Sequence, residues 1–115
     1  MDRKFRLTRS DDFKRVRRNG RSFAHPLVVL MTQANDEPRL RIGFAAGKSV
    51  GSAVRRSRAK RLMREAVRTL LPSLASGWDL VLIARPKLAS ASLGEVRAAL
   101  ADLLQRAGLF PVNES

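Results

Sequence analysis

The segment RIGFAAGKSVGSAVRRSRAKRLMREAVR, residues 41–68, decides the architecture of this chain. Its apolar start, with isoleucine and phenylalanine, predicts a strand over Leu40–Ala46. Gly51 and Ser52 then precede a helical pattern that runs to about Leu71, where a proline follows. A strand that leads through a glycine-containing turn into a long helix indicates a domain in which helices pack on a sheet.

The long helix has one apolar face and one basic face on a helical wheel of about 100° per residue. The apolar face is expected to cover the sheet and comprises Ala59, Leu62, Met63, Ala66, Val67 and Leu70. The opposite face carries Ser57, Arg61, Arg64 and Arg68, with Arg58 and Lys60 on its flanks. Like charges one turn apart repel by a few tenths of a kcal/mol per pair, so a helix built for stability alone would alternate its signs. A bound polyanion would relieve the repulsion, whereas the simpler interpretation is a solvated basic face.

Shorter elements are predicted on both sides of this segment. A first helix is expected to be capped by Ser10 and to stop at Asn19-Gly20. Leu27–Thr32 and Asp79–Ala84 are apolar runs that predict strands. The last helix opens at Ser92, which stands three residues before a glutamate in the spacing of a capping box. Residues 1–9 are predicted to form a flexible basic arm.

These elements predict an α+β fold, a two-layer sandwich in which helices pack on one small, mainly antiparallel sheet. We expect the order αβββαβα, although the residue patterns bound only two of the three strands ahead of the long helix. The 115 residues leave room for a single domain.

The net charge of +13 lies entirely in the first part of the chain. Residues 1–68 hold nineteen Lys/Arg and six acids, whereas the remainder holds four of each. This asymmetry favours a surface that faces a polyanion and a neutral remainder of the chain that serves packing. The absence of cysteine excludes disulfides and thiol chemistry, and neither a secretory signal nor an apolar run long enough for a membrane span is found. We therefore expect a cytoplasmic protein with no membrane partner.

The central motif resembles the bacterial ribonuclease P protein family. That family has a strand with Arg-x-Gly, a lysine before a Gly-x-Ala-Val turn, and Arg-Asn-Arg-x-x-Lys/Arg-Arg on a long helix. The matching residues here are Gly51–Val54, Arg56-Ser57-Arg58 and Lys60-Arg61, with Arg64 one turn further. Weaker matches at residues 7–20 and 79–85 extend the resemblance over most of the chain.

The resemblance implies a protein that joins a large catalytic RNA and assists removal of the 5′ leader from precursor tRNA, without catalytic residues of its own. It implies magnesium bound mainly by the RNA, no metal or other cofactor on the protein, and one protein per RNA. The implied RNA-binding residues are Lys48, Arg56, Ser57, Arg58, Lys60, Arg61, Arg64 and Arg68. The implied leader-binding cleft contains Phe13, Arg17, Val29 and Met31. The family fold, like domain 2 of ribosomal protein S5, also has a left-handed βαβ crossover, which runs against the usual right-handed rule.

This chain departs from the family pattern at four positions. Ser57 replaces the central asparagine, and Gly47-Lys48-Ser49 has one lysine where the family has two. Arg17 stands in place of a second aromatic and Met31 in place of a common tyrosine. With weaker stacking, leader binding is expected to depend more on charge.

Several other motifs favour structural interpretations. Gly43 to Ser49 nearly matches a phosphate-binding P-loop, but three residues rather than four separate its glycines. His25 is expected to be a loop residue and Trp78 a packing residue. Asp11 and Asp12 suit the start of a helix better than a metal site.

Two further function classes stay open on the sequence alone. The first is a structural RNA-binding protein of the ribosome, where small basic α+β domains are common. The second is a DNA-binding module, although recognition helices usually follow a tight helical turn rather than a strand.

Overall fold

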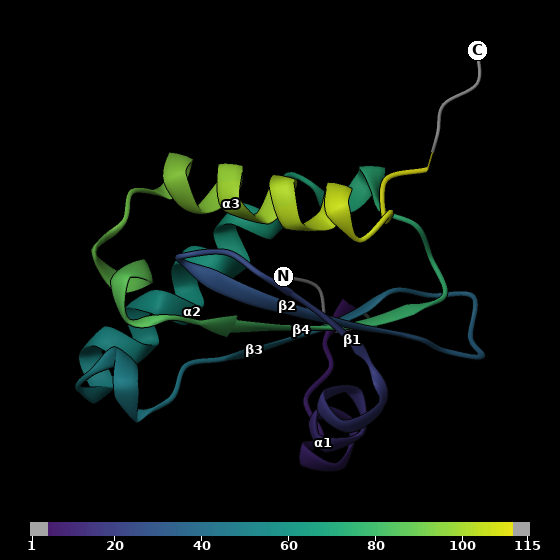
Figure 1. Ribbon diagram of the computed structural model, residues 1–115, viewed down its shortest axis with the longest axis horizontal. Helices are drawn as coiled ribbons and strands as arrows, with labels where there is room; N and C mark the ends of the chain where they lie inside the picture. Colours follow the sequence, from purple (N-terminus) through teal and green to yellow (C-terminus); the bar gives the residue numbers. More distant parts are fainter. Residues whose placement is uncertain (1–4, 112–115) are drawn as a thin grey trace.

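The computed structural model describes residues 5–111, and the elements follow the predicted order αβββαβα. Figure 1 shows them along the chain: α1 (Ser10–Asn19), β1 (Arg21–Ala24), β2 (Val28–Ala34), β3 (Arg41–Ala45), α2 (Ala53–Arg68), β4 (Trp78–Ala84) and α3 (Leu93–Arg106). Short 3-10 turns occupy Lys48–Val50, Leu71–Ser73 and Pro86–Ser90. The α+β class is confirmed.

Two predicted helix boundaries need correction. Ser10 is the first residue of α1 rather than its cap, and Arg9 in the cap position makes no side-chain capping bond. Helix α2 ends at Arg68, earlier than predicted, because the chain tightens into the 3-10 turn that contains Pro72. The capping box of α3 is confirmed, since Ser92 and Glu95 exchange side-chain and backbone hydrogen bonds.

The four strands form one mixed sheet in the order β1-β2-β4-β3. The β1/β2 and β2/β4 pairs are antiparallel, so the sheet is mainly antiparallel as predicted. Strands β3 and β4 are parallel neighbours, and the chain passes between them through α2. This connection is the βαβ unit that the family resemblance implied.

Helices α2 and α3 cover one face of the sheet and enclose the main core (Figure 1). Alternate residues of the strands, such as Leu30 in β2 and Leu82 in β4, point into this core. The predicted apolar face of α2 is confirmed by four fully buried residues, Ala59, Met63, Ala66 and Val67. Because that face lies on the sheet, the basic face of α2 is turned outward.

Helix α1 lies on the opposite face of the sheet (Figure 1). A smaller apolar cluster holds it there, formed by Leu7, Val16 and Val81, with Phe13, Met31 and Ile83 partly buried around them. Gly43 belongs to this contact, since a side chain at that position would collide with the Phe13 ring and lie 2.8 Å from the Leu7 carbonyl oxygen. The glycine thus lets α1 approach the sheet closely.

The predicted basic arm is docked in the part that the structure describes. Arg6 forms a parallel bridge with Ile42 of β3, and the Leu7 amide donates to the Ile42 carbonyl at 2.8 Å. Leu7 is buried. Residues 6 and 7 are therefore extended and attached to β3 through this apolar side chain, while residues 1–4 of the predicted arm lie outside the described range.

Candidate nucleic-acid interface

The start of α2 is fixed by contacts within the protein. Gly51 has a φ of 125°, a conformation that favours glycine, and Ser52 caps the helix by accepting from the Arg55 amide at 3.3 Å. The Arg55 guanidinium donates to the Val50 carbonyl at 3.0 Å and to the Ser90 hydroxyl at 3.2 Å. Arg55 thus ties the helix start to the turn before α3, and its role is structural.

The outward face of α2 carries cations that have no partner in the described protein. Arg58 and Arg61 are exposed, and neither makes a hydrogen bond or ion pair with any residue in the range 5–111. Ser57, next to Arg58 in the sequence, is also exposed, and Val54, one turn before Arg58, is 79% exposed. A row of free guanidinium groups on a rigid helix can contact successive phosphates of a nucleic acid.

Three other cations of the predicted site have neighbours in the protein. Arg68 pairs with Glu65, but both side chains are exposed, so the pair contributes little and can exchange for a phosphate. The Arg64 guanidinium lies 5.6 Å from the centre of the Phe44 ring, in a cation–π contact. The Arg56 Nε is buried without a hydrogen-bond partner, so part of this side chain lies against the protein.

The remaining two predicted cations lie at the margins of this face. Lys60 is half-buried on α2 and Lys48 is exposed in the turn before it. Neither has a hydrogen-bond or ion-pair partner in the described part of the chain. The structure therefore brings the eight predicted residues onto one helix and its preceding turn, and Lys48, Arg58 and Arg61 are the cations among them that are both exposed and unpaired in the described chain.

The predicted cleft residues lie on the sheet face that carries α1. Phe13 and Met31 meet in the small cluster under the helix, and both are partly exposed. Val29 points to the same face as Met31, two residues away along β2. Arg17 is exposed on α1, one turn after Phe13.

Ile83 is a further residue of this apolar floor that was not predicted from the sequence. Ile83 is paired with Val29 in the sheet register and is half-buried. Val81 and Ile83 share a face of β4, but residues 80–84 are uniformly apolar, so the sequence shows no alternation that would separate the two faces. The floor therefore consists of partly exposed apolar side chains from two central strands.

A pocket of about 170 Å³ lies between Phe13 of α1 and Arg64 of α2. It is lined by Arg6, Leu7, Thr8, Phe13, Ile42, Phe44 and Arg64. Phe13 belongs to the cleft and Arg64 to α2, so the pocket connects the two predicted surfaces around the edge of β3. The structure also places Phe44, like Phe23, against the main core.

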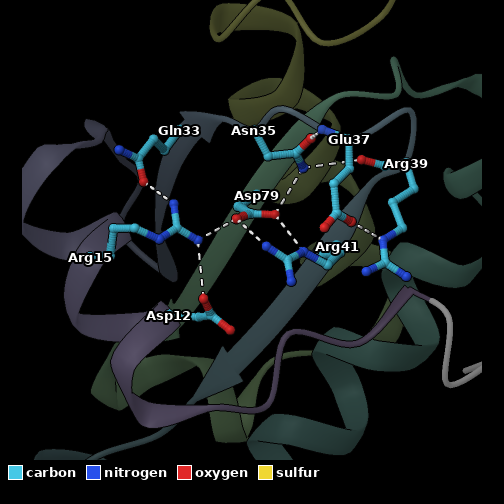
Figure 2. Close-up of polar contacts among 8 residues, drawn as sticks. All are labelled: Asp12, Arg15, Gln33, Asn35, Glu37, Arg39, Arg41 and Asp79. Carbon is cyan, nitrogen blue, oxygen red and sulfur yellow. Dashed lines mark hydrogen bonds and ion pairs between the residues drawn. The ribbon is translucent and has the colours of Figure 1, made fainter.

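An ion-pair network that the sequence did not predict lies at the other end of the α1 face (Figure 2). Asp79 is completely buried, and its carboxylate accepts from Arg41 through two bonds of 2.9 Å, from Asn35 at 2.9 Å, and from Arg15 of α1. Arg15 also donates to Gln33 and Asp12. Burial acts to raise the pKa of Asp79, but the hydrogen bonds from Arg41, Arg15 and Asn35 together outweigh it and lower the pKa below its ordinary value.

His25, Trp78 and Asp12, which were expected to have structural roles, each make contacts within the protein. The His25 Nδ1 accepts from the Leu27 amide at 3.0 Å within the loop before β2. Trp78 packs against the main core at the start of β4, and Asp12 pairs with Arg15 at 3.3 Å. In residues 5–111, no three His, Asp or Glu side chains gather in a way that could hold a metal ion, and no helix has the length and apolarity to cross a membrane.

Comparison with known proteins places this geometry in a family. The family model described as Ribonuclease P matches residues 1–108. The ribonuclease P protein component of Roseiflexus sp. is 40% identical over 100% of this chain and 95% of its own length, and that of Bacillus cereus is 36% identical over 99% and 100%. The solved structure of the Staphylococcus aureus protein superposes with a TM-score of 0.83 at 27% identity, covering 93% of this chain and 98% of that one. The Thermotoga maritima protein gives 0.79 at 30% identity, covering 88% and 96%.

Proposed function

The chain belongs to the ribonuclease P protein family. From this premise we propose that helix α2 binds the catalytic RNA and that the sheet face carrying α1 binds the 5′ leader of precursor tRNA. Membership makes it an accessory subunit of an endoribonuclease whose partner is the ribonuclease P RNA. The ribosomal alternative is not favoured by these relatives.

The observation that supports RNA binding most strongly is the outward face of α2. Arg58 and Arg61 are exposed and have no acidic neighbour within bonding distance in the described chain. Each would gain a phosphate oxygen without giving up a protein contact. Because arginine binds phosphate through two parallel hydrogen bonds, such contacts fix the register of the RNA on the helix.

The α1 face suits a single-stranded leader. Val29, Met31 and Ile83 offer an apolar floor, and Phe13 offers an aromatic ring beside it. Unpaired bases bind such floors through stacking and apolar contact, with little sequence preference. Arg17 would supply charge to the backbone of the leader.

The hydrolysis itself is proposed to be carried out by the RNA with its magnesium ions. The contribution of the protein is then to neutralise phosphates and hold the leader, so that cleavage proceeds at a lower magnesium concentration. We also propose one protein per RNA and a cytoplasmic place of action.

The test is reconstitution with a ribonuclease P RNA. The purified protein should raise the rate of precursor tRNA cleavage at low magnesium, and the benefit should be small for a substrate whose leader has been shortened to one nucleotide. No stimulation at low magnesium would reject the proposed function. Equal stimulation of both substrates would reject the leader-binding part alone.

A further inference from the structure

Helix α1 has few attachments to the rest of the molecule. It packs on β2 and β4 through the small cluster of Leu7, Val16 and Val81, and within residues 5–111 its side-chain hydrogen bonds to the sheet come from Arg15. Figure 2 shows this arginine reaching from α1 to the buried Asp79 of β4 and to Gln33 of β2. Arg15 stands between Phe13 and Arg17, so fixing it also fixes the two α1 residues of the proposed cleft.

We propose that Asp79, with Arg15 and Arg41, is the positioning element of the leader cleft. The inference rests on the proposed function and adds residues that touch no RNA. Asp79 is held from β3 by Arg41 and from the loop after β2 by Asn35, so it offers Arg15 a rigid anchor. Through this anchor the sheet sets the position of α1 above the apolar floor.

The sheet register shows how close the network lies to the floor. On the α1 face, the row that contains Gln33, Asp79 and Arg41 is followed by the row of Met31, Val81 and Gly43. The next row contains Val29, Ile83 and Ala45. The ion pairs therefore lie one row from Met31, and a shift of Arg15 would move α1 relative to the floor.

The same network closes one end of the cleft to RNA. A hollow of about 390 Å³ at this end is lined by Asp12, Arg15, Gln33, Ala34, Asn35, Asp36, Glu37, Arg41 and Asp79. Its two cations, Arg15 and Arg41, are both bound to the Asp79 carboxylate, and three further acids stand beside them. A polyanion meets acids and no unpaired cation here, so a bound strand lies over Val29 and Ile83 instead.

The experiment compares Arg15→Gln with Arg18→Gln in the enzyme reconstituted with ribonuclease P RNA. Both changes remove one positive charge from α1, but Arg18 is exposed and has no bonding partner in the described chain. Affinity is measured for precursor tRNA and for the same tRNA without a leader, and their ratio gives the leader-dependent gain. Affinity of each protein for the RNA subunit is measured alongside.

We expect Arg15→Gln to lower the leader-dependent gain about fivefold, which corresponds to about 1 kcal/mol, the net contribution of one ordinary hydrogen bond. Affinity for the RNA subunit should stay within about twofold, and Arg18→Gln should change the gain less than Arg15→Gln. Arg15→Lys keeps the charge and one contact with Asp79, so it should restore most of the gain.

Two results would overturn the proposal. Equal gains in Arg15→Gln and Arg18→Gln would show that the network does not act on the cleft. A parallel loss of affinity for the RNA subunit would show that Arg15 serves only the stability of the whole domain. A wild-type protein with no leader-dependent gain would instead contradict the proposed function from which the inference starts.

Discussion

The double variant Arg58→Gln/Arg61→Gln removes the two most available cations from the outward face of α2. Both side chains are exposed, and neither has a protein partner in the described chain. Their loss leaves no buried group unsatisfied, so the free energy of unfolding should change by no more than about 0.5 kcal/mol. Removing the two charges also reduces the repulsion between cations along α2, which would offset part of any loss in stability.

The effect on RNA binding follows from counterion release. Each phosphate contact contributes about 0.9 to the slope of log affinity against log salt on a duplex and about 0.7 on a single strand. Losing two contacts should therefore reduce the slope by about 1.4 to 1.8. At about 0.15 M salt, the release of about 0.9 counterions by one phosphate contact contributes about 1 kcal/mol to binding. Losing two contacts therefore costs about 2 kcal/mol, and the variant should bind RNA about thirtyfold more weakly.

The assay is titration of ribonuclease P RNA with protein at several salt concentrations. The matched control is Arg39→Gln/Arg106→Gln, which lowers the net charge by the same amount away from the outward face of α2. Arg39 pairs with Glu37, and Arg106 donates to the Ala24 carbonyl at 2.9 Å, so neither cation is free. We expect the control to keep the slope of the wild-type protein to within about 0.5.

Two results would refute this reasoning. If the α2 variant kept the wild-type slope, phosphates would not be bound at Arg58 and Arg61. If its melting temperature fell by many degrees, the side chains would be structural, and the outward face assigned to α2 would be wrong.

Three further expectations concern single positions. Ser57→Asn should keep or improve RNA affinity, because Ser57 is exposed on the binding face; a loss above about tenfold, or 1.4 kcal/mol, in the same titration would mean that the helix turn contacts RNA differently. Gly43→Ala should lower the free energy of unfolding, measured by urea denaturation, by about 1–3 kcal/mol, because the added methyl group collides with Phe13 and approaches the Leu7 carbonyl to 2.8 Å. Unchanged stability would show that α1 does not pack closely on the sheet at this position. The lowered pKa of Asp79 contributes stability that is present above about pH 4 and is lost as the pH falls toward its value in the folded protein. Asp79→Asn should therefore destabilise the protein by about 3 kcal/mol at neutral pH and flatten the dependence of stability on pH below 4, and an unchanged acid dependence would contradict the ionised buried carboxylate.

The sequence was a reliable guide where one periodic pattern dominated. The apolar pattern of α2 predicted its four buried residues, although Leu62 and Leu70 of the same pattern are only half-buried, and the spacing of Ser92 and Glu95 predicted the cap of α3. Both depend on contacts within one element, and these repeat at fixed intervals along the chain. The outward direction of Arg58 and Arg61 follows from the same periodicity.

What escaped prediction depends on contacts between distant segments. In the sequence, nothing distinguishes Asp79 from the other three acids of residues 69–115. Only the fold brings it together with Arg15 and Arg41. Leu7 likewise gave no sign that it docks on β3. β1 was not bounded because its four residues alternate too briefly to show a period.

The placement of RNA on α2 can be measured directly with a photocrosslinker. The chain has no cysteine, so Ser57→Cys and Gln105→Cys each create a single attachment site, the first on the outward face of α2 and the second exposed on α3. In the complex with ribonuclease P RNA, we expect strong crosslinking from position 57 and little from position 105. Strong crosslinking from position 105 with none from position 57 would contradict the account.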